Sequence, residues 1–373
     1  MAGIYSQALI CGSREAHNRF ITSQSCVTRQ SVARKSSRPT KIGLDIGEND
    51  KDPGEFRDAV VLAEKLGFDV AWLGDHFMPW VHSGNRSAFV WSLLGSCLEA
   101  TKKIRIGPYV TTPIGGRYHP ATIAQASATL DNMYPGRFVL GVGTGEAMNE
   151  VPFLLEWPGW KGRMDRLVEG TLLMRKLWTS KSYFDFQGEF FKASQIFLFT
   201  KPRTDLRILI SSVGEKSAAL AGEYGDGLIT LSSRNPLYRI RDVVFSNFDA
   251  GAGKAHKDPA KMEKIVTISF TLDSPEVFLK KSRGHSGNFA KGALDEPDPR
   301  KIEQMGYGLA NDVLLKSTTF CSKWSDVVEL IWKFRDIGAT QVVLPSGPDT
   351  KLIRTYAQKL LPHLKDGQMR AEG

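Results

Sequence analysis

Two stretches of the chain combine residues capable of acid–base chemistry with the pattern of a buried strand. Residues 69–80 read DVAWLGDHFMPW and residues 138–149 read FVLGVGTGEAMN, so each is an apolar run that ends in polar residues and glycine. The first stretch contains His76, whose imidazole titrates near neutral pH, and the second contains the carboxyl group of Glu146. Such a pair can take a proton from a hydroxyl group or return one.

Each of these residues also has a purely structural explanation. A carboxylate at position 146 suits the start of a helix near Ala147, because the helix dipole favours negative charge there. His76 could be a structural residue at a strand end, and Trp80, which follows Pro79, could belong to a core. The occurrence of both motifs in one chain favours a shared catalytic site.

The elements that must position these residues alternate regularly between strand and helix. Apolar runs that predict strands begin at eight positions: Lys41, Asp69, Ile104, Phe138, Arg207, Gly227, Val266 and Gln341. Segments with helical spacing of apolar residues separate many of them, and Asp52-Pro53-Gly54-Glu55 is a typical helix start. Eight such units predict an α/β fold, a (β/α)8 TIM barrel whose active site lies at the carboxyl ends of the strands.

The predicted domain organisation is a single catalytic barrel at residues 41–365. The segment 273–324 is too long for a plain βα unit, so we interpret it as an insertion at the C-terminal mouth of the barrel. Residues 366–373 form a tail. Residues 1–40 fit three descriptions: a targeting peptide, a disordered extension, or the product of a start codon placed too early.

The composition excludes several classes of function. The net charge is +9, but residues 1–40 hold six Arg and Lys residues against one acidic residue, so the remainder is only mildly basic. This argues against nucleic-acid binding. No apolar run is long enough for a membrane span, and neither the four Cys nor the seven His show metal-binding spacing. We therefore expect a cytoplasmic protein without a metal, and organelle targeting by residues 1–40 stays open.

Four motifs make the chain similar to a known family. They are GDHFMPW (74–80), TPIGGRYHPATIAQA (112–126), MYPGRFVLGVGTGEAMNE (133–150) and AGEYGDGLI (221–229). From Lys41 to Leu361 the chain resembles the luciferase-like superfamily and, within it, the F420-dependent dehydrogenases that act on glucose 6-phosphate or on secondary alcohols. The resemblance implies hydride transfer between a hydroxyl-bearing substrate carbon and C5 of the deazaflavin coenzyme F420, which binds at the barrel mouth.

The resemblance also implies roles for individual residues. The catalytic positions are His76, Trp80 and Glu146. The cofactor-contacting positions are Asp75, Tyr109, Val110, Thr112, Gly143, Thr144, Gly145, Val213 and Gly214, with a non-prolyl cis peptide expected between Tyr109 and Val110. Our hypothesis is that His76 takes the hydroxyl proton and Glu146 protonates N1 of the reduced ring, although the sequence leaves open which residue is acid and which is base.

The predicted substrate-binding positions depart from the family pattern. A lysine that binds the sugar phosphate in relatives falls on Arg234, which can hold a phosphate bidentately. Its arginine partner falls on Ser317, beside Lys316, and the position of a second lysine has only Lys291 nearby. Arg234, Lys291 and Lys316 are therefore the predicted substrate-binding residues, and a small secondary alcohol is the alternative to glucose 6-phosphate.

The resemblance and the composition also indicate alternative functions and the expected partners. The enzyme alternatives are an FMN-dependent luciferase-like monooxygenase and an F420-dependent methylene-tetrahydromethanopterin reductase. The non-enzyme alternative is a barrel that only binds a deazaflavin, as a carrier. In every case the expected partner is a small molecule, with no nucleic acid and no membrane, and the resemblance implies a homodimer.

Overall fold

The chain folds into a closed barrel of parallel strands, seen in a computed structural model that describes residues 40–47, 51–154 and 156–365. Within these residues, eight strands form one sheet in the order β3-β2-β1-β12-β9-β8-β7-β4. They are β1 (Lys41–Ile46), β2 (Val70–Leu73), β3 (Arg105–Pro108), β4 (Leu140–Val142), β7 (Ile208–Ser211), β8 (Gly227–Leu231), β9 (Glu263–Thr267) and β12 (Gln341–Pro345). Every pairing between them is parallel.

Main-chain hydrogen bonds join the two edges of this sheet. The N–H of Ile106 donates to the carbonyl of Arg137, and the N–H of Val139 donates to the carbonyl of Ile106. The segments around β3 and β4 therefore meet, and the predicted TIM barrel is confirmed. Each predicted strand is present, and the largest displacement of a start is at β9, which begins at Glu263 instead of Val266.

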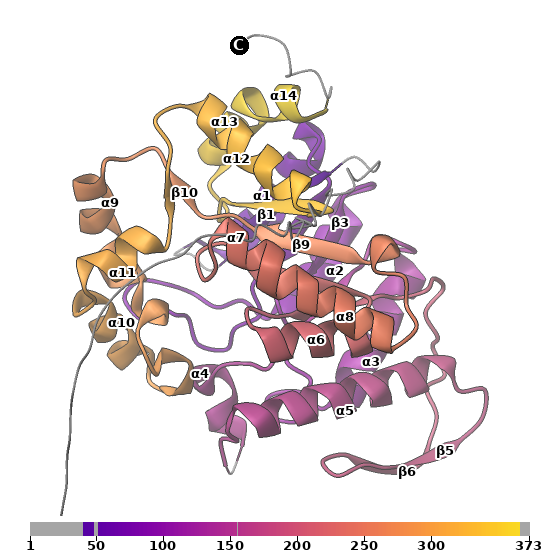
Figure 1. Cartoon of the computed structure of the whole chain (residues 1–373). Coiled ribbons are helices and arrows are strands. Elements are labelled where there is room, and N and C mark those ends of the chain that lie inside the picture. Colours follow the sequence, from indigo (N-terminus) through magenta and orange to yellow (C-terminus); the bar gives the residue numbers. More distant parts are fainter. Residues whose placement is uncertain (1–39, 48–50, 155, 366–373) are drawn as a thin grey trace, which may run out of the picture. The chain divides into compact units, whose positions relative to one another are not determined.

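Helices flank the strands, as Figure 1 shows. The main ones are α1 (Pro53–Leu66), α2 (Val90–Ala100), α3 (Pro120–Met133), α5 (Trp160–Thr179), α6 (Glu215–Tyr224), α8 (Ser246–Lys254), α12 (Trp324–Asp336) and α13 (Thr350–Lys359). The start of α1 matches its predicted signal, because the side chain of Glu55 accepts the N–H of Asp52 at 3.0 Å. Gly67 then ends α1 in the left-handed conformation, with φ of 91°.

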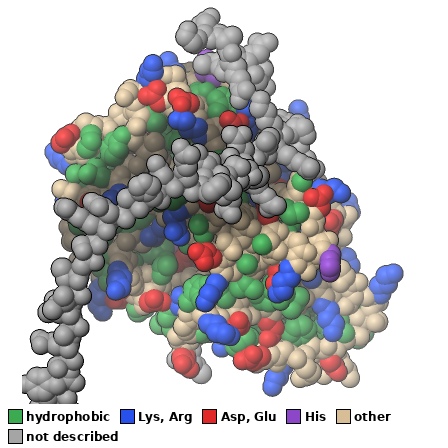
Figure 2. Space-filling model, in the orientation of Figure 1, with side chains coloured by type: hydrophobic (Ala, Val, Ile, Leu, Met, Phe, Trp, Pro, Cys, Tyr) green, Lys and Arg blue, Asp and Glu red, His purple; other side chains and the backbone are tan. Residues whose placement is uncertain are grey.

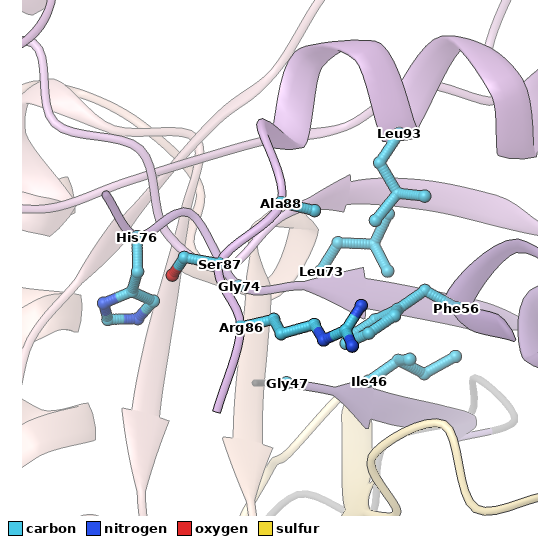
Figure 3. A pocket seen from close by; sticks show the side chains of 10 residues that line it. All are labelled: Ile46, Gly47, Phe56, Leu73, Gly74, His76, Arg86, Ser87, Ala88 and Leu93. Carbon is cyan, nitrogen blue, oxygen red and sulfur yellow. The ribbon is translucent and has the colours of Figure 1, made fainter. Parts of the chain in front are cut away.

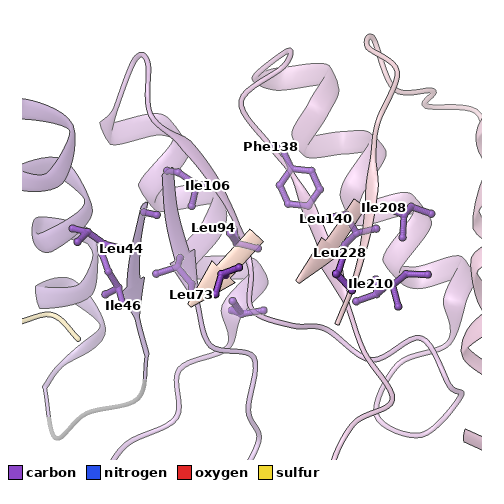
Figure 4. Close-up of a cluster of buried hydrophobic side chains, with 14 of the residues drawn as sticks. Leu44, Ile46, Leu73, Leu94, Ile106, Phe138, Leu140, Ile208, Ile210 and Leu228 are labelled. Atoms are coloured by element: carbon purple, nitrogen blue, oxygen red, sulfur yellow. The ribbon is translucent and has the colours of Figure 1, made fainter. Parts of the chain in front are cut away.

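Alternate residues of each strand face two different cores. The barrel interior is filled by fully buried side chains: Val70, Trp72, Val139, Leu209, Ile229, Ile265 and Val343. The intervening residues pack outwards, and Figure 4 shows part of that layer, which includes Leu44, Leu73, Leu140, Ile210 and Leu228. Two packed layers around a closed sheet hold the strand ends in fixed positions.

Several shorter elements were not predicted. Strands β5 (Phe184–Gln187) and β6 (Lys192–Ile196) form an antiparallel hairpin after α5, and β10 (Phe270–Thr271) pairs with β11 (Thr319–Phe320). The unpredicted elements also include α7 (Leu237–Arg239), a π-helical turn η2 (Ile240–Phe245) and α14 (Leu361–Lys365). In contrast, α4 (Ala147–Glu150) begins where the sequence indicated a helix start near Ala147. Two 3-10 turns lie outside the segment 273–324: η1 (Val151–Phe153) and η3 (Pro259–Lys261).

The predicted insertion at 273–324 is helical and packs against the loops at the mouth. It contains α9 (Pro275–Ser282), η4 (Arg283–His285), η5 (Gly287–Phe289), η6 (Ala293–Asp295), α10 (Pro299–Tyr307) and α11 (Asn311–Lys316). Ala293 and Ile302 of this segment form a buried apolar cluster with Met148, against which Trp80 packs. The insertion therefore supplies one wall beside the predicted site.

The face of the molecule seen in Figure 2 has no continuous stripe of basic side chains among the residues that are coloured by type. On that face Lys and Arg side chains are interspersed with Asp and Glu. None of the described helices is both long and apolar enough to cross a bilayer. The predicted extension at 1–40, except for residue 40, and the predicted tail at 366–373 lie outside the described residues.

Candidate active site

His76 and Glu146 meet on one side-chain amide, that of Asn149. His76 lies just beyond the carboxyl end of β2, and Glu146 lies in the glycine-rich turn after β4. The amide nitrogen of Asn149 is 2.9 Å from Nδ1 of His76 and 3.2 Å from Oε2 of Glu146. The two residues singled out from the sequence therefore lie at one place in the fold, at the mouth of the barrel.

Asn149 is a site residue that the sequence analysis did not identify. Its amide oxygen accepts the main-chain N–H of Phe77 at 2.7 Å and of Met78 at 3.1 Å. The residue is 2% exposed and belongs to α4, one helical turn after Glu146. The three-residue spacing between Glu146 and Asn149 in the motif GEAMN is the signal that could have located it.

Trp80 stands next to His76. The centroids of the two rings are 6.1 Å apart, with an edge-on angle of 65° between the ring planes. The indole also packs against the apolar cluster of Met148, Ala293 and Ile302, so the insertion holds it in place. Trp80 is thus positioned both by its own loop and by the insertion.

Asp75 points into the protein rather than along the surface of the mouth. Its carboxylate lies 3.0 Å from a guanidinium nitrogen of Arg117 and accepts the hydroxyl of Tyr118 at 3.1 Å. Burial raises the pKa of Asp75, while Arg117 and the hydroxyl of Thr111 act in the opposite direction. The pair links the loop after β2 to the loop after β3.

A second buried carboxyl group lies beside this pair. Glu150 is 2% exposed, and its Oε2 accepts the main-chain N–H of Arg117 at 2.9 Å. Burial raises the pKa of Glu150 to about 7, and the negative charges of Glu146 and Asp75 act in the same direction. A carboxyl group with this pKa changes its charge near neutral pH, which the sequence alone did not indicate.

Tyr109 and Val110 form an apolar floor between the barrel interior and the mouth. The peptide bond between them is cis, as the resemblance implied. The Tyr109 ring lies 5.6 Å from that of Trp72 in the barrel interior, and its hydroxyl is hydrogen-bonded to Thr267. Both residues pack on the interior core, so the floor is supported from below.

The glycine-rich turn 143–145 lies directly against this floor. A Cβ atom on Gly143 would approach Cγ2 of Val110 to 2.7 Å. Gly145 has φ of +71°, and a Cβ there would meet Cγ2 of Thr112 at 2.8 Å. Thr144 is half-buried between the two glycines. Only glycine allows so close an approach of two backbone segments, which brings five of the predicted cofactor positions together.

Val213 and Gly214 lie at a neighbouring strand end, after β7. The carbonyl of Val213 accepts the amide of Asn235 at 2.9 Å, and Gly214 is the N-cap residue of α6. The Val213 side chain is 42% exposed. The N–H of Gly214 is also bonded, to the hydroxyl of Ser217, so what these two positions expose at the carboxyl end of the barrel is mainly the apolar side chain of Val213.

In the described part of the chain, the three predicted substrate-binding cations contact different neighbours and do not form one cluster. Arg234 donates to the carbonyl of Asn288, and its guanidinium carbon lies 4.6 Å from the centroid of the Phe289 ring. Lys316 pairs with Asp312 one helical turn away and is 79% exposed. Lys291 is also exposed. Arg234 thus fastens the insertion to the loop after β8.

Two hollows adjoin the loop after β2. Figure 3 shows a small one, of about 20 Å3, with the rings of His76 and Phe56 among its lining residues. A larger groove, of about 440 Å3, runs between this loop and the insertion. Its lining is mostly apolar and consists of Met78, Pro79, His82, Pro297, Asp298, Pro299 and Arg300.

Comparison with known proteins shows which family this chain belongs to. Residues 26–341 match the family model described as luciferase-like monooxygenase. The F420-dependent glucose-6-phosphate dehydrogenase of Segniliparus rotundus is 33% identical over 336 residues, which are 88% of this chain and 99% of that protein. A second relative with the same activity in its name, from Rhodococcus jostii, is 32% identical over 87% of this chain and 98% of its own length.

Solved structures agree with this assignment. An F420-dependent secondary alcohol dehydrogenase, in complex with an F420-acetone adduct, is 34% identical with a TM-score of 0.80, over 88% of this chain and all of that chain. The F420-dependent tetrahydromethanopterin reductase of Methanopyrus kandleri is 21% identical with a TM-score of 0.71, over 88% and 100% of the two chains, and shows the shared fold. The chain therefore belongs to the luciferase-like family of TIM-barrel enzymes, close to members named as F420-dependent dehydrogenases.

Proposed function

We propose that this protein is an F420-dependent oxidoreductase that transfers a hydride between a hydroxyl-bearing substrate carbon and coenzyme F420. The observation that carries the proposal is the convergence of His76 and Glu146 on the amide of Asn149. Two titratable side chains from different strand ends are thereby held at one place in the mouth of the barrel. The names of the relatives at 33% and 34% identity support the same cofactor and reaction.

The residues at the mouth support a deazaflavin ring as the ligand. Val110 supplies an apolar floor, and the turn 143–145 lies close against it because its two glycines carry no side chain. We propose that Tyr109, Val110, Thr112, Gly143, Thr144, Gly145, Val213 and Gly214 form the cofactor site. Asp75, whose buried carboxylate pairs with Arg117, supports that site from behind. When bound there, F420 supplies the carbon, C5, that accepts or returns the hydride.

The chain's own catalytic groups are His76, Trp80 and Glu146 in this proposal. His76 and Trp80, with their rings 6.1 Å apart, bind and orient the substrate oxygen. Glu146 is half-buried and holds or releases a proton at its carboxylate. Among the described residues, no group of three or more His, Cys, Asp or Glu side chains could hold a metal ion.

A small secondary alcohol is better supported as substrate than a sugar phosphate. A phosphate would need the guanidinium of Arg234, which already bonds to Asn288 and stacks over Phe289. Lys316 is occupied by Asp312 on an exposed helix. Beside His76, the apolar cluster of Met148, Ala293 and Ile302 packs against Trp80, which suits an uncharged substituent better than a phosphate.

The test is an assay of the purified protein with added F420. Loss of the deazaflavin absorbance with small secondary alcohols, and little loss with glucose 6-phosphate, is the expected result. Efficient turnover of glucose 6-phosphate would overturn the substrate preference but support the reaction class. Tight binding of FMN with consumption of oxygen would overturn the cofactor assignment. F420 binding without turnover of any alcohol would indicate a carrier.

We further propose that the protein acts as a cytoplasmic homodimer. The family resemblance supports a homodimer, and light scattering on the eluting protein measures it against the chain mass of 41.4 kDa. The cytoplasmic location stays a prediction, because residues 1–39 lie outside the described residues. Fractionation of cells that express the full chain and a chain beginning at Lys41 tests whether that segment directs transport.

A further inference from the structure

Every hydrogen-bonding position of the Asn149 side chain is used inside the protein. Its oxygen has two acceptor positions, which take the N–H groups of Phe77 and Met78. Its nitrogen has two hydrogens, and the two atoms within reach are Nδ1 of His76 and Oε2 of Glu146. The amide is therefore fully satisfied while it is 2% exposed.

These partners fix which end of the amide faces His76. Rotation of the amide by half a turn would place its NH2 group against two main-chain N–H donors, at 2.7 and 3.1 Å, and its oxygen against the Glu146 carboxylate. Both changes would replace hydrogen bonds by repulsive contacts in a buried position. The NH2 group of Asn149 therefore faces the imidazole and must act as the donor.

From this arrangement we infer that Asn149 is a positioning residue that fixes the tautomer of His76, with Nδ1 unprotonated and the proton on Nε2. A donor facing Nδ1 requires a lone pair on that atom, so the neutral ring carries its hydrogen on the opposite nitrogen. A proton added to Nδ1 would point at the NH2 group of Asn149. The contact therefore disfavours both the other tautomer and the imidazolium form.

Charged groups near the ring act in the opposite direction to the amide contact. Among the described residues, the neighbouring carboxylates include Asp75, which precedes His76 and interacts with it electrostatically, and Glu146, which shares the amide. Both favour a positively charged imidazole. Arg117 neutralises part of this effect, because it is paired with Asp75 at 3.0 Å.

The consequence for catalysis rests on the proposed function. With its hydrogen on Nε2, His76 donates a hydrogen bond to the substrate oxygen and does not take the hydroxyl proton. The sequence-based hypothesis makes His76 the base, which needs a free lone pair on Nε2. The ring hydrogen would then be on Nδ1 and would point at the NH2 group of Asn149. Glu146, the other titratable group on the same amide, is left as the proton acceptor when an alcohol is oxidised.

Nitrogen NMR on the cofactor-free, full-length protein with labelled histidine tests the tautomer directly. Signals of His76 are assigned by their loss in His76→Gln. The wild type should show an unprotonated Nδ1 and a protonated Nε2 near neutral pH. In Asn149→Asp the new carboxylate keeps the main-chain N–H partners and accepts from the ring, so Nδ1 should become protonated.

The matched control is the same substitution at an asparagine far from the ring. Asn132 is half-buried and donates to the carbonyl of Lys201 at 3.2 Å, on the far end of α3, so Asn132→Asp should leave the His76 signals unchanged. In the F420-linked assay, kcat of Asn149→Asp should fall by about 10- to 10,000-fold, the range spanned by other residues that orient a histidine. The KM for F420 should change little, because no polar atom of Asn149 is left for the cofactor.

The outcomes separate this inference from the proposed function. A protonated Nδ1 in the wild type, or an unchanged tautomer in Asn149→Asp, overturns the role of Asn149 whatever the protein catalyses. The protein could give the expected NMR spectra and still lack F420-linked activity. That result would support the assigned tautomer of His76 and refute only the proposed function. If Asn149→Asp does not fold, the wild-type spectrum still decides, and Asn149→Ala should populate both tautomers.

Discussion

The guanidinium group of Arg117 lies 3.0 Å from the carboxylate of Asp75, and their side chains are only 8% and 1% exposed. Arg117 also lies over the ring of Tyr118, at 4.7 Å from its centroid, and Tyr118 donates to the same carboxylate. Asp75 directly precedes His76. This buried pair therefore fixes the backbone from which the His76 imidazole projects.

Removal of the Asp75 charge should destabilise the protein strongly. In Asp75→Asn the Arg117 guanidinium stays buried without its counter-ion, and loss of one partner of a buried pair costs about 3–5 kcal/mol. Urea unfolding followed by tryptophan fluorescence measures the change in the free energy of unfolding.

Asp58→Asn is the matched control for this measurement. Asp58 pairs with Arg57 on α1, where the side chains are 65% and 45% exposed, so its removal should change stability by less than about 1 kcal/mol. Equal losses in the two variants would mean that burial gives the Asp75–Arg117 pair no special structural role.

Glu150→Gln should change how stability depends on pH. The pKa of Glu150 is about 7 in the folded protein and 4.5 ordinarily, so between these values the folded state holds a proton that the unfolded chain has released. The free energy of unfolding therefore falls as pH rises through this window, by roughly 3 kcal/mol at 1.36 kcal/mol per pKa unit. Glutamine cannot ionise, so the variant should be more stable than the wild type at pH 8 and similar to it at pH 4.5.

Unfolding curves at several pH values measure this difference. The control is Glu329→Gln, which removes a carboxylate that is 65% exposed and should leave the pH dependence unaltered. The same fall in stability in wild type and Glu150→Gln would show that another group is responsible. Because the amide oxygen of the introduced glutamine could still accept the N–H of Arg117, loss of that hydrogen bond does not complicate the comparison.

The barrel was predictable because its strands are buried on both faces. Segments such as LGV in β4 and QVVLP in β12 are short apolar runs, a pattern that does not depend on distant partners. The hairpin of β5 and β6 was missed because its strands are short and mix aromatic with polar residues. In FDFQ, intermediate and exposed positions alternate over only four residues.

The site was predictable only in part. His76 and Glu146 belong to recognisable motifs, whereas Asn149 and Arg117 act through contacts with residues 73 and 42 positions away. Such contacts exist only after the loops following β2, β3 and β4 have met at the mouth. The raised pKa of Glu150 arises mainly from burial, which one sequence does not reveal for a polar residue in a short helix.

Gly145→Ala should loosen the floor of the cofactor site. Gly145 has φ of +71°, where alanine is strained by about 1 kcal/mol, and its Cβ would lie 2.8 Å from Thr112 and 3.0 Å from Glu150. We expect a loss of stability and weaker F420 binding, measured by thermal unfolding and fluorescence titration. Gly253→Ala in α8 is the control, because its Cβ meets nothing within 4 Å and should be neutral or stabilising.

His76→Ala should abolish most of the turnover and spare the cofactor site. In the proposed function the substitution removes the imidazole that binds the substrate oxygen, but Val110 and the turn 143–145 remain as they are. We expect kcat to fall by roughly 100- to 10,000-fold, with the Kd for F420 within a few-fold of the wild type. His363→Ala, at an exposed position of α14, should retain full activity. Steady-state assays and F420 titration separate the two effects, and undiminished kcat in His76→Ala would refute the assignment of this site.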